Sequence, residues 1–357
     1  MKKTVKYSIW ALMMVALVSC GKHEVPAPKP KVGDLLTFGT PEGKLAYEGG
    51  RSGAGSTLAT AKGMESMPMA VYGIYETGEN IFDNLPEKVY YVPSYTDAKG
   101  DTYTNQWVYG DPSKYNCGTA EEPRKPWNRL LRHTFKAFHP YDPTGTNVAN
   151  GLPDGNIQSM SDAQRLVLDY YTQTNKFDLM VARATRYPLT EGVGKLTMSF
   201  SHVLSALQFK VNYATEIDDT LVGAQLDGMG ASGVLYYGVM FAGDTDTTIR
   251  WTVAPPTDDN YQWSGAVPFS HTTYATAYDG DGVIFAIPQT IEEGQVTFRF
   301  KTGVGDTAEH RAKLPAITWE PGKKYVYTIT LKGAELDVKV TIKEWTDVKS
   351  NMDIYIQ

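Results

Sequence analysis

The residue with the clearest chemical assignment is Cys20, which ends the run Leu17-Val18-Ser19-Cys20. An apolar, a variable and a small residue before a cysteine form the pattern at which bacteria attach diacylglycerol to the thiol and then cut the chain in front of it. Lys2, Lys3 and Lys6 precede an apolar run from Ile9 to Val18 that is too short to span a bilayer as a stable helix. Residues 1–19 are therefore predicted to be a lipoprotein signal peptide and Cys20 the lipidated residue; an ordinary cleaved signal peptide is the alternative.

Few other residues are spaced for chemistry. Gly192–Leu196 lacks the hydroxyl residue of a phosphate-binding loop, and the sequence contains no nucleophile elbow, H-E-x-x-H or C-x-x-C motif. Asp279–Gly282 resembles the start of a calcium loop, but Thr290 stands where the final glutamate ligand is needed, which favours a tight turn. His202 has no second ligand at matched spacing, which favours a hydrogen-bonded core histidine. The sequence predicts no catalytic residue, no metal site and no cofactor.

Aromatic residues are the remaining candidates for binding. Trp251, Tyr261, Trp263 and Tyr274 lie close together in the sequence. Aromatic faces stack on pyranose rings, so these side chains could line a sugar platform. Ordinary core and loop packing is the alternative. Trp251 and Trp263 are the residues proposed at this point as glycan contacts.

The overall composition limits the class of protein. The 357 residues carry 34 Lys+Arg against 40 Asp+Glu, a net charge of −6, which argues against a nucleic-acid binder because such a protein needs a basic face. Two cysteines exclude a disulfide scaffold. The 23 tyrosines, 33 glycines and 20 prolines favour β structure with many turns.

Apolar alternation predicts many short strands, the first within Asp34–Thr40. The main later ones are expected at Met69–Tyr75, Val89–Tyr95, Gln106–Tyr109, His133–Pro140, Val234–Phe241, Ile249–Val253, Gly282–Ile287, Gln295–Lys301, Tyr325–Leu331 and Leu336–Ile342. The alternation changes phase between Leu196–Leu204 and Val203–Val211, which indicates a bulge or a turn between two strands. One helix is expected, with Ser161 as N-cap and Asp162–Leu168 following it.

The strands fall into two series, which predicts an all-β protein of two β-sandwich domains. After a Pro- and Lys-rich tether over residues 20–33, the N-terminal domain is expected at 34–190 and the C-terminal domain at 191–357. The Gly-rich stretch Gly43–Gly63 is expected to be exposed and open to proteolytic nicking, because glycine loses the most backbone entropy on ordering.

A set of short motifs follows the Cys20 motif in a fixed order. They are Pro68–Tyr75, Phe135–Pro140, Asp178–Ala182, Leu196–Leu207, Ile287–Gln289, Trp319–Tyr325 and Ile342–Trp345. In this order the chain resembles the fimbrillin-like lipoproteins of Bacteroidales, the subunits of type V pili. The resemblance implies two tandem transthyretin-like Greek-key sandwiches and export as a lipoprotein to the outer membrane and the cell surface.

The resemblance also implies a route of assembly. In stalk subunits of this family, a trypsin-like protease cuts after a basic residue in the loop behind the first strand, and the opened groove accepts the C-terminal strand of a neighbour. Here the first strand is Leu35–Phe38 and the cut is expected between Arg51 and Ser52, with Lys44 and Lys62 as weaker substitutes. The donor strand is expected to use Met352, Ile354 and Ile356, which form an apolar row.

Two other interpretations stay open. The chain could be a tip or anchor subunit that keeps its lipid and is not cut. It could also be a surface carbohydrate-binding lipoprotein of a glycan-uptake system. The expected partners are other fimbrial subunits, the outer membrane through the lipid, and a host or bacterial surface glycan or protein; no nucleic acid is expected.

Overall fold

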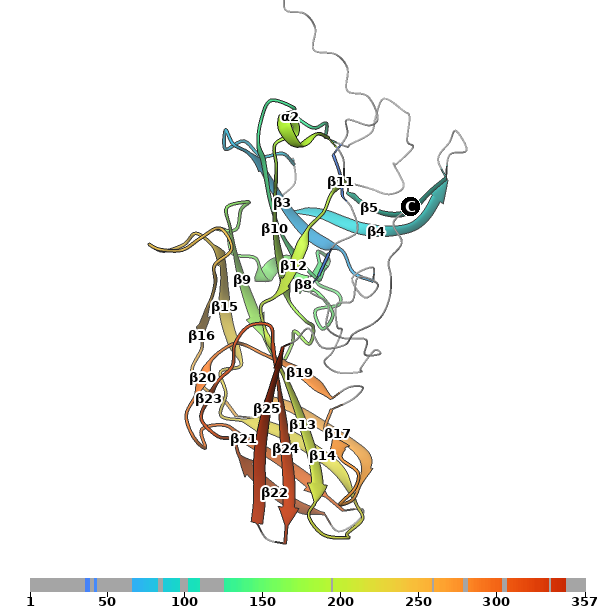
Figure 1. The fold of residues 1–357 in the computed structure, drawn as a ribbon, viewed down its shortest axis with the longest axis vertical. Helices are drawn as coiled ribbons and strands as arrows, with labels where there is room; N and C mark the ends of the chain where they lie inside the picture. The colour runs from blue at the N-terminus through green and yellow to red at the C-terminus, as the bar shows by residue number, and fades with distance from the viewer. Residues whose placement is uncertain are drawn as a thin grey trace, which may run out of the picture.

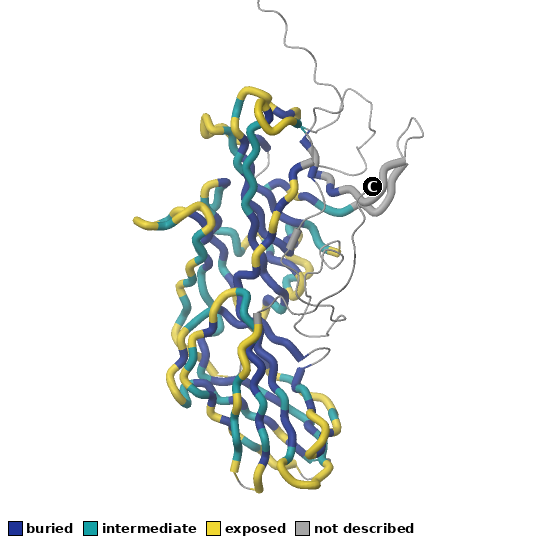
Figure 2. The backbone as a smooth tube through the Cα atoms, in the orientation of Figure 1, coloured by how far each residue is buried: buried dark blue, intermediate teal, exposed yellow. Residues whose placement is uncertain are grey.

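The structure of the chain is a computed structural model. It describes residues 36–38, 42–43, 66–82, 86–96, 102–109, 125–193, 195–258, 260–278, 282–303, 307–333 and 335–344. Strands dominate it, and they form two β-rich halves that follow one another along the long axis (Figure 1). Buried residues run through the middle of both halves, and exposed residues gather at loops and outer faces (Figure 2). The prediction of an all-β sandwich protein is confirmed.

The upper half contains a nine-stranded sheet in the order β11-β1-β5-β4-β3-β6-β10-β12-β2. Its strands are β1 (Thr37–Phe38), β2 (Glu42–Gly43), β3 (Met69–Tyr75), β4 (Glu87–Thr96), β5 (Thr102–Tyr109), β6 (His133–His139), β10 (Met180–Arg186), β11 (Lys195–Leu196) and β12 (Ser199–His202). The central strand β3 has a core on each side. Met69 and Val71 lie in one buried cluster, and Ala70 and Tyr72 lie in another.

A three-stranded sheet in the order β16-β15-β9 supplies core residues to the second of these clusters. Its strands are β9 (Arg165–Tyr171), β15 (Ser232–Gly238) and β16 (Ile249–Val253), so it combines residues from both sides of the boundary expected at 190/191. Strands β11 and β12, which also follow that boundary, join the nine-stranded sheet. The expected division therefore does not coincide with the sheets, because alternation shows where a strand is but not which strand it pairs with.

The lower half is a sandwich of two sheets with an aromatic core. One sheet has the order β18-β13-β24-β25, with β19 also paired to β13, and the other has the order β17-β14-β21-β22. The strands are β13 (Ser205–Tyr213), β14 (Asp219–Asp227), β17 (Asn260–Phe269), β18 (Ala275–Thr276), β19 (Val283–Ala286), β21 (Thr297–Thr302), β22 (Ala308–Lys313), β24 (Lys323–Lys332) and β25 (Glu335–Glu344). Phe209 stacks between Phe298 (4.3 Å between ring centroids) and Tyr327 (5.1 Å).

The two halves meet where the alternation changes phase. Strand β12 belongs to the nine-stranded sheet and β13 to the lower sandwich, so the chain changes sheets at the fully buried Val203 and Leu204. Short elements complete the fold: β7 (Tyr141–Asp142), β8 (Leu152–Pro153), β20 (Thr290–Ile291), β23 (Ile317–Thr318), α2 (Pro188–Glu191) and the 3₁₀ turn Asp154–Asn156. No helix in the described ranges has the length and apolar character to cross a membrane.

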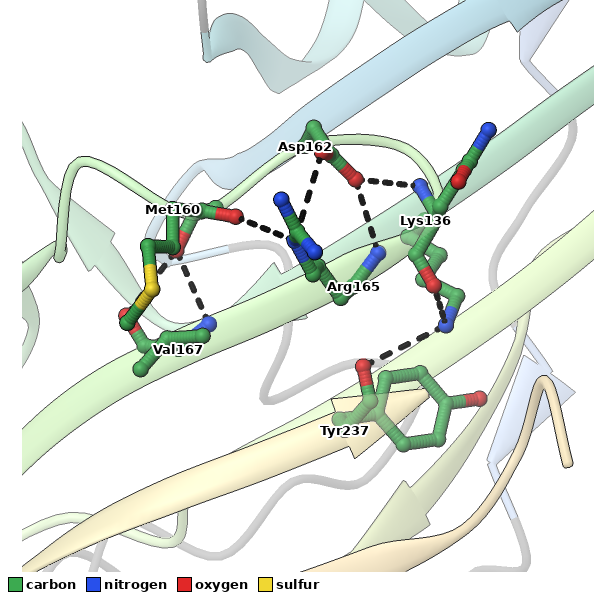
Figure 3. Close-up of polar contacts among 8 residues, drawn as sticks. Lys136, Met160, Asp162, Arg165, Val167 and Tyr237 are labelled. Atoms are coloured by element: carbon green, nitrogen blue, oxygen red, sulfur yellow. Dashed lines mark hydrogen bonds and ion pairs between the residues drawn. The ribbon is translucent and has the colours of Figure 1, made fainter. Parts of the chain in front are cut away.

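The helix expected at 161–168 is wrong. The Asp162 carboxylate accepts hydrogen bonds from the backbone N–H groups of Gln164 (2.7 Å) and Arg165 (2.9 Å), which makes a turn (Figure 3). Strand β9 begins at Arg165 and pairs along its length with β15. The Ser and Asp side chains that favour a helix start also favour such turns, and pairing with a distant strand decided between the two.

A buried lysine ties β6 to the end of β15 (Figure 3). The Lys136 Nζ donates to the backbone carbonyls of Gln164 (2.6 Å) and Tyr237 (3.2 Å) and lies 4.6 Å from the centre of the Tyr237 ring. Burial lowers the pKa of Lys136 to about 8. Gly238 follows at φ 118°, and a Cβ there would overlap the Lys136 ammonium, so only glycine fits at this position.

Candidate assembly site at the N-terminal strand

Strand β1 lies between two other strands. Thr37 and Phe38 pair in parallel with Lys195 and Leu196 of β11. On its other side, Phe38 pairs with Trp107 of β5 in the antiparallel direction. A segment from the start of the chain therefore occupies an interior position in the sheet, where its removal would leave unpaired backbone groups on both neighbours.

The same segment continues beside β12. Glu42 and Gly43 of β2 pair in parallel with Ser199 and Phe200 of β12. Strand β12 also pairs with β10, and β1 also pairs with β5. Through residues 37–38 and 42–43, the pairings with β11 and β12 therefore connect the β5 side of the sheet to the β10 side and close it.

The side chains of this segment fill the core of the closed sheet. Leu36 is 0% exposed and Phe38 is 2% exposed. The Phe38 ring makes edge contacts with Tyr109 (6.0 Å) and Phe135 (6.2 Å), and the Leu36 N–H donates to the Lys125 carbonyl (2.9 Å). Truncating a buried Leu or Phe to Ala typically costs about 2–5 kcal/mol, so the segment contributes substantially to folding.

The structure locates only part of the predicted site. The expected first strand is present, with Leu36 and Phe38 buried. Its interior position was not expected, because the sequence of a short apolar segment does not show how many neighbours it has. The processing residues Arg51 and Ser52, the substitutes Lys44 and Lys62, the lipidation residue Cys20 and the donor residues Met352, Ile354 and Ile356 lie outside the described residues.

The described chain ends in an edge strand of the lower sandwich. Strand β25 pairs with β24 alone and ends at Glu344, eight residues before Met352. Leu336, Val338 and Val340 pack partly buried against the core, whereas Ile342 is 54% exposed.

Both tryptophans considered as glycan contacts lie on the core-facing side of their strands. Trp251 packs against Tyr170 (6.2 Å between ring centroids), and its Nε1 donates to the Val203 carbonyl (2.8 Å). Trp263 packs against the core of the lower sandwich beside Tyr278 (6.4 Å). The two indoles belong to different core clusters, so the structure does not bring them together as one platform.

The expected core histidine is confirmed, and its partner was missed. His202 Nδ1 lies 2.6 Å from the Asp178 carboxylate, and both side chains are buried. Burial raises the pKa of Asp178, and the facing imidazole partly offsets this. Alternation could have placed Asp178 next to strand Met180–Arg186, but only the pairing of Met180 with His202 brings the two side chains together. In the described ranges, no group of three His, Cys, Asp or Glu residues could hold a metal ion.

Comparisons with known proteins agree with this architecture. A family model described as fimbrillin-like matches residues 77–345. A fimbrial protein from Bacteroides vulgatus has a similar structure (TM-score 0.52, 14% identity, 83% of this chain and 100% of that chain).

Two further solved structures align over most of this chain. A cell adhesion protein from Bacteroides uniformis aligns with a TM-score of 0.47 (17% identity, 88% and 99% coverage), and a fimbrial assembly protein from Parabacteroides distasonis with 0.38 (11% identity, 78% and 91% coverage). Of these three structures, only the one from Bacteroides vulgatus has a TM-score above 0.5. Because its sequence identity is only 14%, it supports the fold and not the function. A search of curated proteins gives no match. Because the family model covers well over half of the sequence, the chain belongs to the fimbrillin-like family.

Proposed function

We propose that this chain is a non-enzymatic structural or adhesive subunit of a cell-surface pilus. It is exported as an outer-membrane lipoprotein acylated at Cys20, cut after Arg51, and polymerised when the C-terminal segment of one subunit replaces residues 36–43 of the next. Membership of the fimbrillin-like family supports the subunit role. The further steps rest on the following arguments from the sequence and from the site.

The observation that carries the proposal is the interior position of β1 in the nine-stranded sheet. Residues 36–43 close the nine-stranded sheet, yet they are joined to β3 through the Gly-rich stretch that contains Arg51. A cut there would separate the closing strand from the rest of the chain. Losing it would expose the backbone edges of β5 and β11 and empty the sites of Leu36 and Phe38, and both losses favour insertion of another strand.

The C-terminal segment has the pattern that this slot requires. Leu36 and Phe38 are two residues apart and point into one core, and Ile354 and Ile356 repeat that spacing. Each subunit would give one strand and accept one, so the contact is head-to-tail and continues as a filament.

A photocrosslinking experiment tests this exchange. With Ile354 and Ile356 in the places of Leu36 and Phe38, Tyr355 takes the place of Thr37, opposite Lys195. Replacing Tyr355 by the photoreactive analogue p-benzoylphenylalanine should therefore give, in assembled pili, crosslinks to β5 or β11 of another copy. The matched control places the analogue at Tyr274, which is 51% exposed on a loop of the lower sandwich and should give none to these strands. Crosslinks from position 355 that avoid β5 and β11 would overturn the proposed exchange.

A further inference from the structure

A hollow of about 360 Å³ lies on the sheet β17-β14-β21-β22 of the lower sandwich. Leu226 and Phe298 pack inward, whereas Phe300 belongs to the core and also borders the hollow, as does Trp263. Exposed or half-buried polar side chains line the hollow, namely Gln225, Gln262, Ser264, Arg299, Lys301 and Glu309. The hollow is therefore open to solvent, on the side of the sheet away from the core.

The hollow exists because β14 is irregular and lacks one side chain. The pairing of β14 shifts register between Leu221 and Gly223, and on the β17 side again between Ala224 and Leu226. A Cβ added to Gly223 would meet only the Trp263 carbonyl oxygen (3.6 Å) and the Lys301 side chain (3.8 Å), which are ordinary contacts. Neither backbone conformation nor packing requires glycine here. A glycine inside a strand marks a bulge or a place where a ligand or another backbone approaches closely, and the free space above Gly223 leaves room for a ligand.

Hydrogen-bonding groups surround Gly223 on both sides. Ser264 of β17 and Lys301 of β21 are its direct cross-strand neighbours. Among the described contacts Lys301 has no ion pair, because Glu309 across from it accepts a hydrogen bond from Arg311 (3.0 Å). Two residues further along β14, Gln225 lies opposite Arg299 of β21. The Arg299 guanidinium forms an ion pair with Asp227. The hollow thus presents amide, hydroxyl and carboxylate groups together with one uncommitted ammonium group.

These features identify the class of ligand. Strands β14 and β21 each have a partner on both sides, so a peptide cannot bind here by adding a strand. Donors and acceptors placed next to each other match hydroxyl groups, which donate and accept at once. Lys301, which has no ion pair among the described residues, favours a carboxylate. We propose that this hollow binds an acidic saccharide, with Gly223 as its floor and Lys301 as the contact to the sugar carboxylate.

Calorimetry with the full chain tests the proposal with matched sugars. The sugar 3′-sialyllactose should bind more tightly than lactose, which lacks the sialic acid. A Cβ at Gly223 makes only ordinary contacts, so Gly223→Val should place its side chain in the hollow and weaken 3′-sialyllactose binding by about tenfold or more, because the floor is then blocked. Gly155→Val is the control: Gly155 lies in the 3₁₀ turn of the upper half with nothing near its Cβ position, and this change should leave binding unaltered.

A second variant separates charge from shape. Lys301→Gln should weaken 3′-sialyllactose binding by about tenfold and leave lactose binding unchanged, because the lost interaction is a charge-assisted hydrogen bond. Equal binding of 3′-sialyllactose and lactose, or full binding by Gly223→Val, would overturn the proposal. Failure to bind both 3′-sialyllactose and a second acidic sugar, trigalacturonate, would overturn it as well. The measurement uses unpolymerised protein, so its result is independent of strand exchange.

Discussion

The upper sheet and the lower sandwich differ in how they are completed. The strands of the lower sandwich all come from residues 205–344, and its central strand β24 pairs along its length with β13 and β25. The nine-stranded sheet instead includes residues 37–38 and 42–43, which lie far from its other strands in the sequence. Both regions have aromatic cores, built around Phe38 in one and Phe209 in the other. The described strands of the lower sandwich are therefore contiguous in the sequence, whereas the upper sheet includes a distant N-terminal segment, the one that we propose is exchanged.

The largest expected effect comes from removing the donor segment. Deleting residues 352–357 should abolish polymer and leave a folded monomer, because the strands that carry the described core of the lower sandwich lie within residues 205–344. Electron microscopy of sheared surface material, with circular dichroism of the monomer, checks both parts. If the deletion variant forms normal pili, residues 352–357 are not the donor strand.

Blocking the cut should stop assembly at an earlier step. Arg51→Ala should leave the chain lipidated and unpolymerised, because residues 36–43 then stay in their slot. Lys44→Ala and Lys62→Ala serve as matched controls from the same stretch and should assemble normally. Immunoblotting of membrane and pilus fractions distinguishes the outcomes, and assembly by Arg51→Ala with failure of either lysine variant would move the cut to that lysine.

Two phenylalanine truncations separate the two regions. Phe38→Ala should lower the free energy of unfolding by about 3–5 kcal/mol in the uncut chain, because the ring fills the core beside Tyr109 and Phe135. Once the segment has been cut off and lost, the shortened chain no longer contains residue 38 and is the same with or without this change. Phe209→Ala should cost about 3–5 kcal/mol in both forms. Denaturant melts of cut and uncut protein measure these costs, and a Phe38→Ala cost in the uncut chain far below that of Phe209→Ala would contradict the role of the segment in the core of the upper sheet.

The smallest expected effect is a pH dependence of the unfolding free energy that comes from Lys136 in the upper sheet. Burial lowers the pKa of Lys136 in the folded protein to about 8, below the ordinary value of 10.5, so between these values the unfolded chain holds the proton more tightly. Relative to Lys136→Met, the wild-type protein should gain about 1–2 kcal/mol of stability between pH 8 and pH 10. Urea melts at several pH values check the slope, and a pH-independent difference would show that Lys136 keeps an ordinary pKa.

Sequence patterns were most informative where burial alone decides the structure. The run Met69–Tyr75 and the alternation of Tyr325 to Leu331 predicted β3 and the inward row of β24, because their apolar periods leave no other solution. Partner choice was not predictable. Strand β9 pairs with β15, more than sixty residues later, and Thr37 and Phe38 lie between β11 and β5. Such pairings depend on the packing of the whole core. The Asp178–His202 contact was missed for the same reason, because it depends on the pairing of β10 with β12.

The central claim is that the closing segment of the upper sheet is removed before assembly. The most direct test is the intact mass and N-terminal sequence of the protein from isolated pili and from the outer membrane. We expect pilus subunits that begin at Ser52 and carry no lipid, beside a membrane-bound precursor acylated at Cys20. Pilus subunits that retain residues 36–43 and an acylated Cys20 would contradict the account.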